Sequence, residues 1–122
     1  MLPSEVASRL LYFLAMTRIF READWKMFRQ LHSIALERYC QKVLDEIAQL
    51  VADSKTTAHQ RYLKIYKVIQ ERDRTIGEAF NDLRRSTALM RLVTIHSYGL
   101  ITDDEIRGFT QETRDVISRL SA

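Results

Sequence analysis

Glycine, proline and cysteine are scarce in this chain of 122 residues, which has three glycines, one proline and one cysteine. Proteins rich in β-structure need glycine and proline for their tight turns, so this composition argues against a β-sandwich or a β-barrel. The single cysteine, Cys40, cannot form an internal disulfide, and nothing indicates a secreted, disulfide-linked scaffold. What remains is a set of helices joined by short loops.

Long apolar runs are also missing. The longest runs from Leu10 to Met16, whereas a helix that spans a bilayer needs about 20 apolar residues. Glu5 precedes this run and no small-residue cleavage site follows it, which is not typical of a signal peptide. We therefore expect a cytoplasmic protein with no membrane segment. Its length and its 46% hydrophobic and 29% charged residues predict one folded domain, residues 1–122.

Large apolar residues then return at alternating steps of four and three over residues 62–90, with Asp73 and Thr87 filling the two remaining positions. This 3.5-residue rhythm predicts a long helix packed into a seam between other helices. The polar run Gln70–Thr75 leaves two alternatives, a continuous helix or a break with a restart at Thr75, and continuous phase across the run favours the first. Asp73 is either buried with a partner or, as we prefer, an exposed carboxylate.

Capping signals and apolar spacing define the other helices. We expect a very apolar first helix that starts near Pro3–Ser4 and a second helix that runs from a cap at Asp24 to about Ala52. A loop at residues 53–57 follows, and a capping box of Thr57 and Gln60 begins the long third helix. We also expect a short helix over Ala88–Ile95 that is ended by Gly99, and a last helix that begins at a capping box of Thr102 and Glu105. Together they predict an all-α fold, a four- to five-helix bundle with two long helices. The surplus of apolar surface on the first three helices predicts a homodimer.

Metal and cofactor sites are not indicated. Di-iron helical bundles place a glutamate three residues before each ligand histidine, and here those positions hold Arg29, Thr56 and Val93. One cysteine and three scattered histidines cannot make a zinc site. We therefore expect no metal and no cofactor.

The hexapeptide from Arg91 to His96 resembles a motif of the HEPN family, small helical and often dimeric ribonucleases and nucleotide-binding proteins. The resemblance implies that Arg91 would stabilise phosphate charge and that His96 would transfer a proton or bind a 2′-oxygen. Leu92 departs from the family, in which a polar residue usually follows the arginine.

The charge is uneven along the chain. The net charge is +3, but residues 54–101 alone carry nine basic and four acidic residues. Lys64, Lys67, Arg84 and Arg85 are candidate nucleic-acid-binding residues in this segment, because nucleic acids are bound through basic stripes. Acidic residues lie among them, which favours an ordinary solvated face.

Two functions from different classes follow. The first is a small intracellular interaction or regulatory module with no catalysis, acting through its helical faces on an unknown protein partner. The second is a HEPN-like RNA- or nucleotide-binding protein, a candidate ribonuclease, that uses Arg91 and His96. The apolar residue after Arg91 favours the first.

Overall fold

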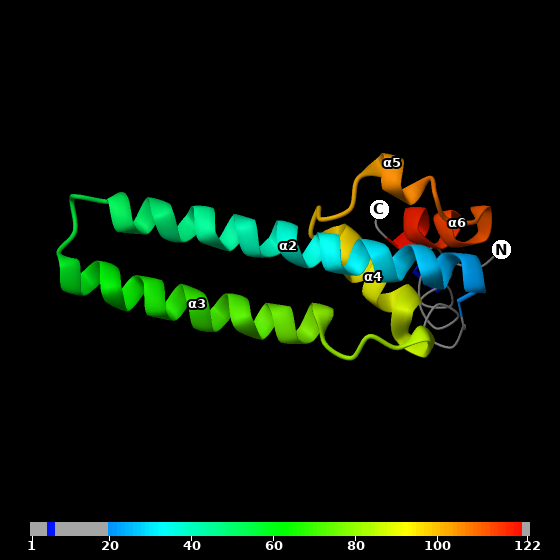
Figure 1. Ribbon diagram of the computed structural model, residues 1–122, viewed down its shortest axis with the longest axis horizontal. Coiled ribbons are helices and arrows are strands. Elements are labelled where there is room, and N and C mark those ends of the chain that lie inside the picture. The colour runs from blue at the N-terminus through cyan, green and yellow to red at the C-terminus, as the bar shows by residue number, and fades with distance from the viewer. Residues whose placement is uncertain (1–4, 7–19, 121–122) are drawn as a thin grey trace.

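The computed structural model describes residues 5–6 and 20–120, and these residues form an all-helical structure with no strand (Figure 1). The elements are α2 (Glu22–Ala52), α3 (Ala58–Phe80), the 3₁₀ turn η1 (Arg85–Thr87), α4 (Ala88–Ser97), α5 (Asp103–Ile106) and α6 (Gln111–Leu120). The predicted all-α class and the two long helices are confirmed. The predicted first helix lies almost wholly outside the described residues.

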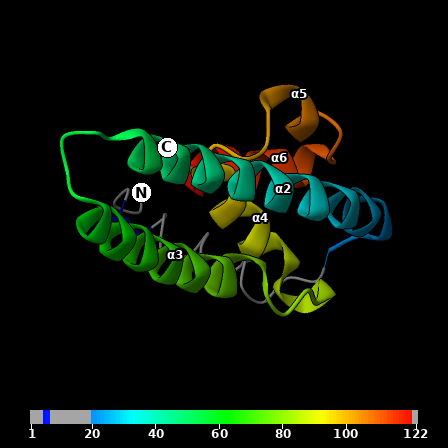
Figure 2. The same cartoon turned by 60° about the vertical axis from the view of Figure 1, so that its left-hand side comes forward.

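Helices α2 and α3 form an antiparallel hairpin whose turn follows the predicted loop at residues 53–57. The predicted capping box begins α3, since Gln60 N donates to Thr57 Oγ1 over 3.1 Å and Thr57 N donates to Gln60 Oε1 over 3.3 Å. The helix then continues through the polar run at residues 70–75, as favoured, and Asp73 is exposed. Both views show α2 and α3 side by side (Figures 1 and 2).

The end of α3 differs from the prediction. The helix stops at Phe80, whereas the apolar rhythm over residues 62–90 predicted that it would run further. Asp82 adopts a left-handed conformation with φ of 64°, which aspartate tolerates better than most residues and which an α-helix does not allow. The carbonyl oxygen of Phe80, which has no partner within the helix, accepts a hydrogen bond from Nε2 of His32 on α2 over 2.9 Å. This tertiary contact stabilises the early end of α3.

The core lies at the end of the hairpin away from its turn. Buried apolar side chains come from Phe20 just before α2, the first half of α2, the last residues of α3, helices α4 and α6, and the segments on either side of α5. They are Phe20, Phe28, Leu31, Ala35, Ala79, Phe80, Ala88, Leu89, Leu92, Val93, Ile95, Leu100, Ile101, Phe109 and Ile117. Helix α4 contributes five of these residues, and Gly99 (φ 72°) ends it as predicted, in a Schellman motif in which Gly99 N donates to His96 O and Leu100 N donates to Ile95 O.

Two helices replace the single last helix that the sequence predicted. The Thr102–Glu105 capping box forms, but α5 ends at Ile106 and α6 starts at Gln111. The chain turns at Gly108, where an added Cβ would stand 2.7 Å from Met27 Cε, and this close approach lets Phe109 enter the core. Burial of Phe109 therefore outweighs the local tendency to continue the helix.

Asp24 does not cap α2, contrary to the prediction. The cap position is Arg21, and Asp24 lies in the first turn with only 1% of its surface exposed. Its carboxylate accepts hydrogen bonds from Thr110 N (2.9 Å), Thr110 Oγ1 (2.7 Å) and Thr113 Oγ1 (2.7 Å). Asp24 thus joins the start of α2 to the start of α6, a connection across 86 residues of sequence.

A second polar connection fixes α5 against α2. Arg38 binds both carboxylate oxygens of Glu105, at 2.7 and 2.9 Å, and also donates to Leu100 O over 2.9 Å. The hydrogen bonds from Arg38, helped by the backbone of Thr102 and opposed by desolvation, lower the pKa of Glu105 from 4.5 to about 2. Glu105 therefore holds its own helix cap and the long helix α2 at the same time.

Candidate interaction surface on the hairpin

The outer part of the α2–α3 hairpin extends beyond the core (Figure 1). All buried residues of α2 lie between Asp24 and Ala35, and the only buried residues of α3 are Ala79 and Phe80. The remaining 17 residues of α2 and 21 of α3 hold no buried side chain, and at 1.5 Å per residue they extend about 25–30 Å. A two-helix projection of this size has little core of its own.

A narrow seam holds the two helices together. Half-buried residues from both sides meet along it, namely Tyr39, Val43, Ile47 and Leu50 of α2 and Arg61, Ile65, Val68 and Arg72 of α3. Arg72 binds Glu46 in a two-pronged ion pair, with Nε–Oε2 at 3.1 Å and Nη2–Oε1 at 2.9 Å. This hydrogen bonding lowers the pKa of Glu46 and raises that of Arg72, so both groups stay charged.

One flank of the hairpin is apolar and exposed. Five large side chains follow a seam residue by one position, and about half or more of the surface of each is exposed: Leu44, Val51, Tyr62, Tyr66 and Ile69. One position turns a side chain by about 100° around its helix. Because α2 and α3 run in opposite directions, the same step brings residues of both helices to the same side of the seam. The five side chains therefore form one surface, which we call the apolar flank.

This surface corrects the interpretation of the apolar rhythm in α3. We predicted that Tyr62, Tyr66 and Ile69 would pack between helices, but Tyr62 is 65% and Tyr66 56% exposed. Only the end of the same stripe, Ile76 and Phe80, reaches the core. A different stripe, offset by one residue, makes the contact with α2, and it includes Arg61 and Arg72. Because Arg61 and Arg72 are polar, apolar periodicity alone does not reveal this second stripe.

The opposite side of the seam is polar. Residues that precede a seam residue by one position lie there, and these are Arg38, Lys42, Glu46, Gln49, Gln60, Lys64, Lys67 and Glu71. The candidate nucleic-acid residues Lys64 and Lys67 are therefore exposed on one side, while Tyr62 and Tyr66 lie on the other. The structure does not interleave lysines and tyrosines on a single surface.

The other two candidate basic residues lie at the far end of α3. From Lys67 to the end of α3 at Phe80 the helix rises about 20 Å, so Arg84 and Arg85 are distant from the lysines. Arg84 pairs with Asp82 at 2.5 Å. Arg85 donates to Phe20 O over 2.6 Å and pairs with Glu22 at 2.9 Å, which ties η1 to the start of α2. The four residues do not form one patch.

Arg91 and His96 both lie on α4 and are both half-buried. Five positions on a helix place two side chains about 140° apart, so they do not share a face. Arg91 donates to the carbonyl of Glu78 near the end of α3, a contact that positions α4 against α3. Within this chain the two side chains are not assembled around one point.

In the described part of the chain, residues 5–6 and 20–120, no group of histidine, cysteine, aspartate and glutamate side chains could hold a metal ion. None of the helices within those residues has a stretch long and apolar enough to cross a membrane. Comparison with protein-family models, with curated proteins and with solved structures finds no match to this chain.

Proposed function

We propose that this protein is a small, non-catalytic helical interaction module that associates with a second copy of itself through the apolar flank of the α2–α3 hairpin. The observation that carries the proposal is the position of Leu44, Val51, Tyr62, Tyr66 and Ile69 on one side of a projecting hairpin. Apolar surface of this kind, continuous over two helices, is typical of association sites.

A second copy suits this flank for two reasons. The five flank residues carry no charge, and Asp73, which follows the seam residue Arg72, adds one negative charge only at the core end of the flank. The apolar centre of the flank therefore does not select a charged partner over its own copy. A two-fold axis would lay two hairpins flank to flank, which produces an antiparallel four-helix arrangement of the kind that buries both apolar stripes of each helix. The flank extends about 10 Å along each helix, from Leu44 to Val51 and from Tyr62 to Ile69, which is small for a protein interface, so we expect a dimer that dissociates on dilution.

The test is light scattering after size-exclusion chromatography over a range of protein concentrations. Tyr66→Glu places a charge in the centre of the apolar flank and should give a monomer at concentrations where the native chain is a dimer. Gln49→Glu adds the same charge on the polar side of the same hairpin and should leave the dimer intact. Circular dichroism of both variants checks that the helices remain.

Two results would overturn the proposal. A native chain that stays monomeric at every concentration would leave the flank to another occupant, for which the apolar run Leu10–Met16 is the candidate in the sequence. A dimer that survives Tyr66→Glu would place the interface elsewhere. Total RNA added at low and high salt in the same experiment addresses the HEPN-like alternative, which stays a prediction because Arg91 and His96 lie about 140° apart around α4.

A further inference from the structure

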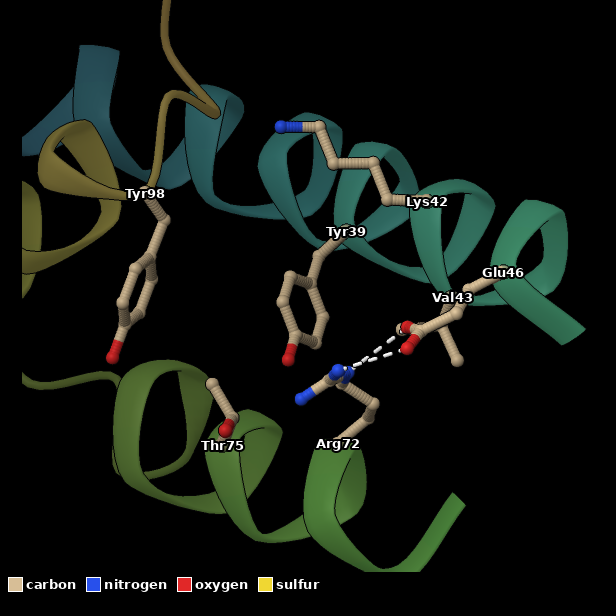
Figure 3. A pocket seen from close by; sticks show the side chains of 7 residues that line it. All are labelled: Tyr39, Lys42, Val43, Glu46, Arg72, Thr75 and Tyr98. Carbon is tan, nitrogen blue, oxygen red and sulfur yellow. Dashed lines mark hydrogen bonds and ion pairs between the residues drawn. The ribbon is translucent and has the colours of Figure 1, made fainter. Parts of the chain in front are cut away.

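A cleft opens at the base of the hairpin, on the side opposite the apolar flank (Figure 3). Its volume is about 360 Å³, within the lower range of small-molecule sites. Helix α2, helix α3 and the C-terminal cap of α4 line it with Tyr39, Lys42, Val43, Glu46, Arg72, Thr75 and Tyr98. Segments distant in sequence therefore meet here around a space that none of them fills.

Several polar groups in this cleft are available to a ligand. Arg72 uses Nε and Nη2 for Glu46, while its Nη1 forms no hydrogen bond to any described residue. The hydroxyl groups of Tyr39 and Tyr98 also form no hydrogen bond to a described residue. Figure 3 shows both hydroxyl groups directed toward α3. Thr75 already donates its hydroxyl proton to Glu71 O. The unused donors are thus one guanidinium nitrogen and two phenols.

The charge of the lining favours an anion. Arg72 and Glu46 neutralise each other, and Lys42 adds one positive charge. Its ammonium group lies at the rim beside Gly99, where an added Cβ would be 3.9 Å away. The rings of Tyr39 and Tyr98 and the side chain of Val43 supply apolar surface between these donors.

We propose that this cleft binds a small aromatic anion, a ring bearing a carboxylate or a phosphate monoester. The ring would contact the two tyrosine rings, and the anionic oxygens would accept hydrogen bonds from Arg72 Nη1 and the phenols. The cleft lies on the polar side of the seam, so it stays open whether or not the apolar flank is covered, and the proposal does not depend on the dimer.

The experiment is an NMR titration of the full chain with four probes: benzoate, phenyl phosphate, inorganic phosphate and benzyl alcohol. Benzoate or phenyl phosphate should shift the backbone amides around residues 39–46, 72–75 and 98, and the stronger of the two identifies the anionic group. Inorganic phosphate and benzyl alcohol, which lack the ring and the charge respectively, should bind at least tenfold more weakly.

Variants test the named donors. The double variant Tyr39→Phe, Tyr98→Phe keeps both rings and should weaken the anion by about tenfold, the effect of losing hydrogen bonds to a charged group. Glu46→Gln removes the negative charge beside Arg72 and should tighten binding, a gain that a merely structural role would not produce. Arg74→Gln, an equal loss of charge from an exposed neighbour on α3, is the matched control for Arg72→Gln and should leave binding unchanged.

Three results would overturn the proposal. The first is the absence of shifts at these amides up to about 10 mM of either aromatic anion, ten times the dissociation constant of a weak specific complex. The second is equal binding of benzyl alcohol, which would remove the selection for charge. The third is equal loss of binding in Arg72→Gln and Arg74→Gln, which would indicate general electrostatic attraction.

Discussion

Replacement of Asp24 by alanine should destabilise the fold by about 3 kcal/mol, because it removes the acceptor for three hydrogen bonds. The hydroxyl of Thr113 is the most affected partner, since that residue is 0% exposed and cannot turn to water. A buried polar group without a partner costs about 1–3 kcal/mol. Thr110 is half-buried and regains some hydration, so its two bonds add about 1 kcal/mol between them.

Urea unfolding at a fixed protein concentration, followed by circular dichroism, measures this loss. Asp45→Ala on the exposed side of the same helix is the control and should change the free energy of unfolding by less than about 0.5 kcal/mol. Thr113→Val, which keeps the shape of the side chain, should cost about 1 kcal/mol. The double variant Asp24→Ala, Thr113→Val should lose less free energy of unfolding than the two single variants together, because both changes remove the same hydrogen bond between Thr113 and Asp24.

The reasoning fails if Asp24→Ala is as stable as Asp45→Ala, or if the losses of Asp24→Ala and Thr113→Val simply add. The first result would mean that the carboxylate is hydrated in solution. The second would mean that Asp24 and Thr113 act on stability through different contacts.

Two further predictions concern the segment around α5. Gly99→Ala should cost about 1 kcal/mol in the same unfolding assay, because residue 99 has a φ of 72°, which alanine adopts only under strain; an unchanged midpoint would contradict the Schellman geometry. The pKa of Glu105 is about 2 in the folded chain against 4.5 normally, so its ionised form stabilises the fold above pH 4.5, and this stabilisation is lost as the pH falls from 4.5 to 2. Because Arg38 is partly exposed, we expect a difference between the native chain and Glu105→Gln of only about 1–2 kcal/mol at pH 6, shrinking toward pH 2; a difference independent of pH would refute the ion pair.

The candidate surfaces follow the sequence only in part. The apolar rhythm over residues 62–90 places Tyr62, Tyr66 and Ile69 on one stripe of α3, while Leu44 and Val51 are apolar residues of α2. That these residues share an exposed flank depends on which stripe of each helix makes the seam, and the seam includes Arg61 and Arg72. Hydrophobicity alone cannot identify an arginine as a packing residue, because its stem packs while its charge pairs with a distant glutamate.

Local signals by themselves determined the helical class and several helix ends. The capping boxes of Thr57 and Thr102 and the left-handed Gly99 act within a few residues, so the sequence shows them directly. The tertiary structure alone decided where α3 stops, why the last helix divides at Gly108, and what Asp24, Arg38 and Arg72 bind. Each of these depends on contacts across 26 to 89 residues, between partners that only the packed helices bring together.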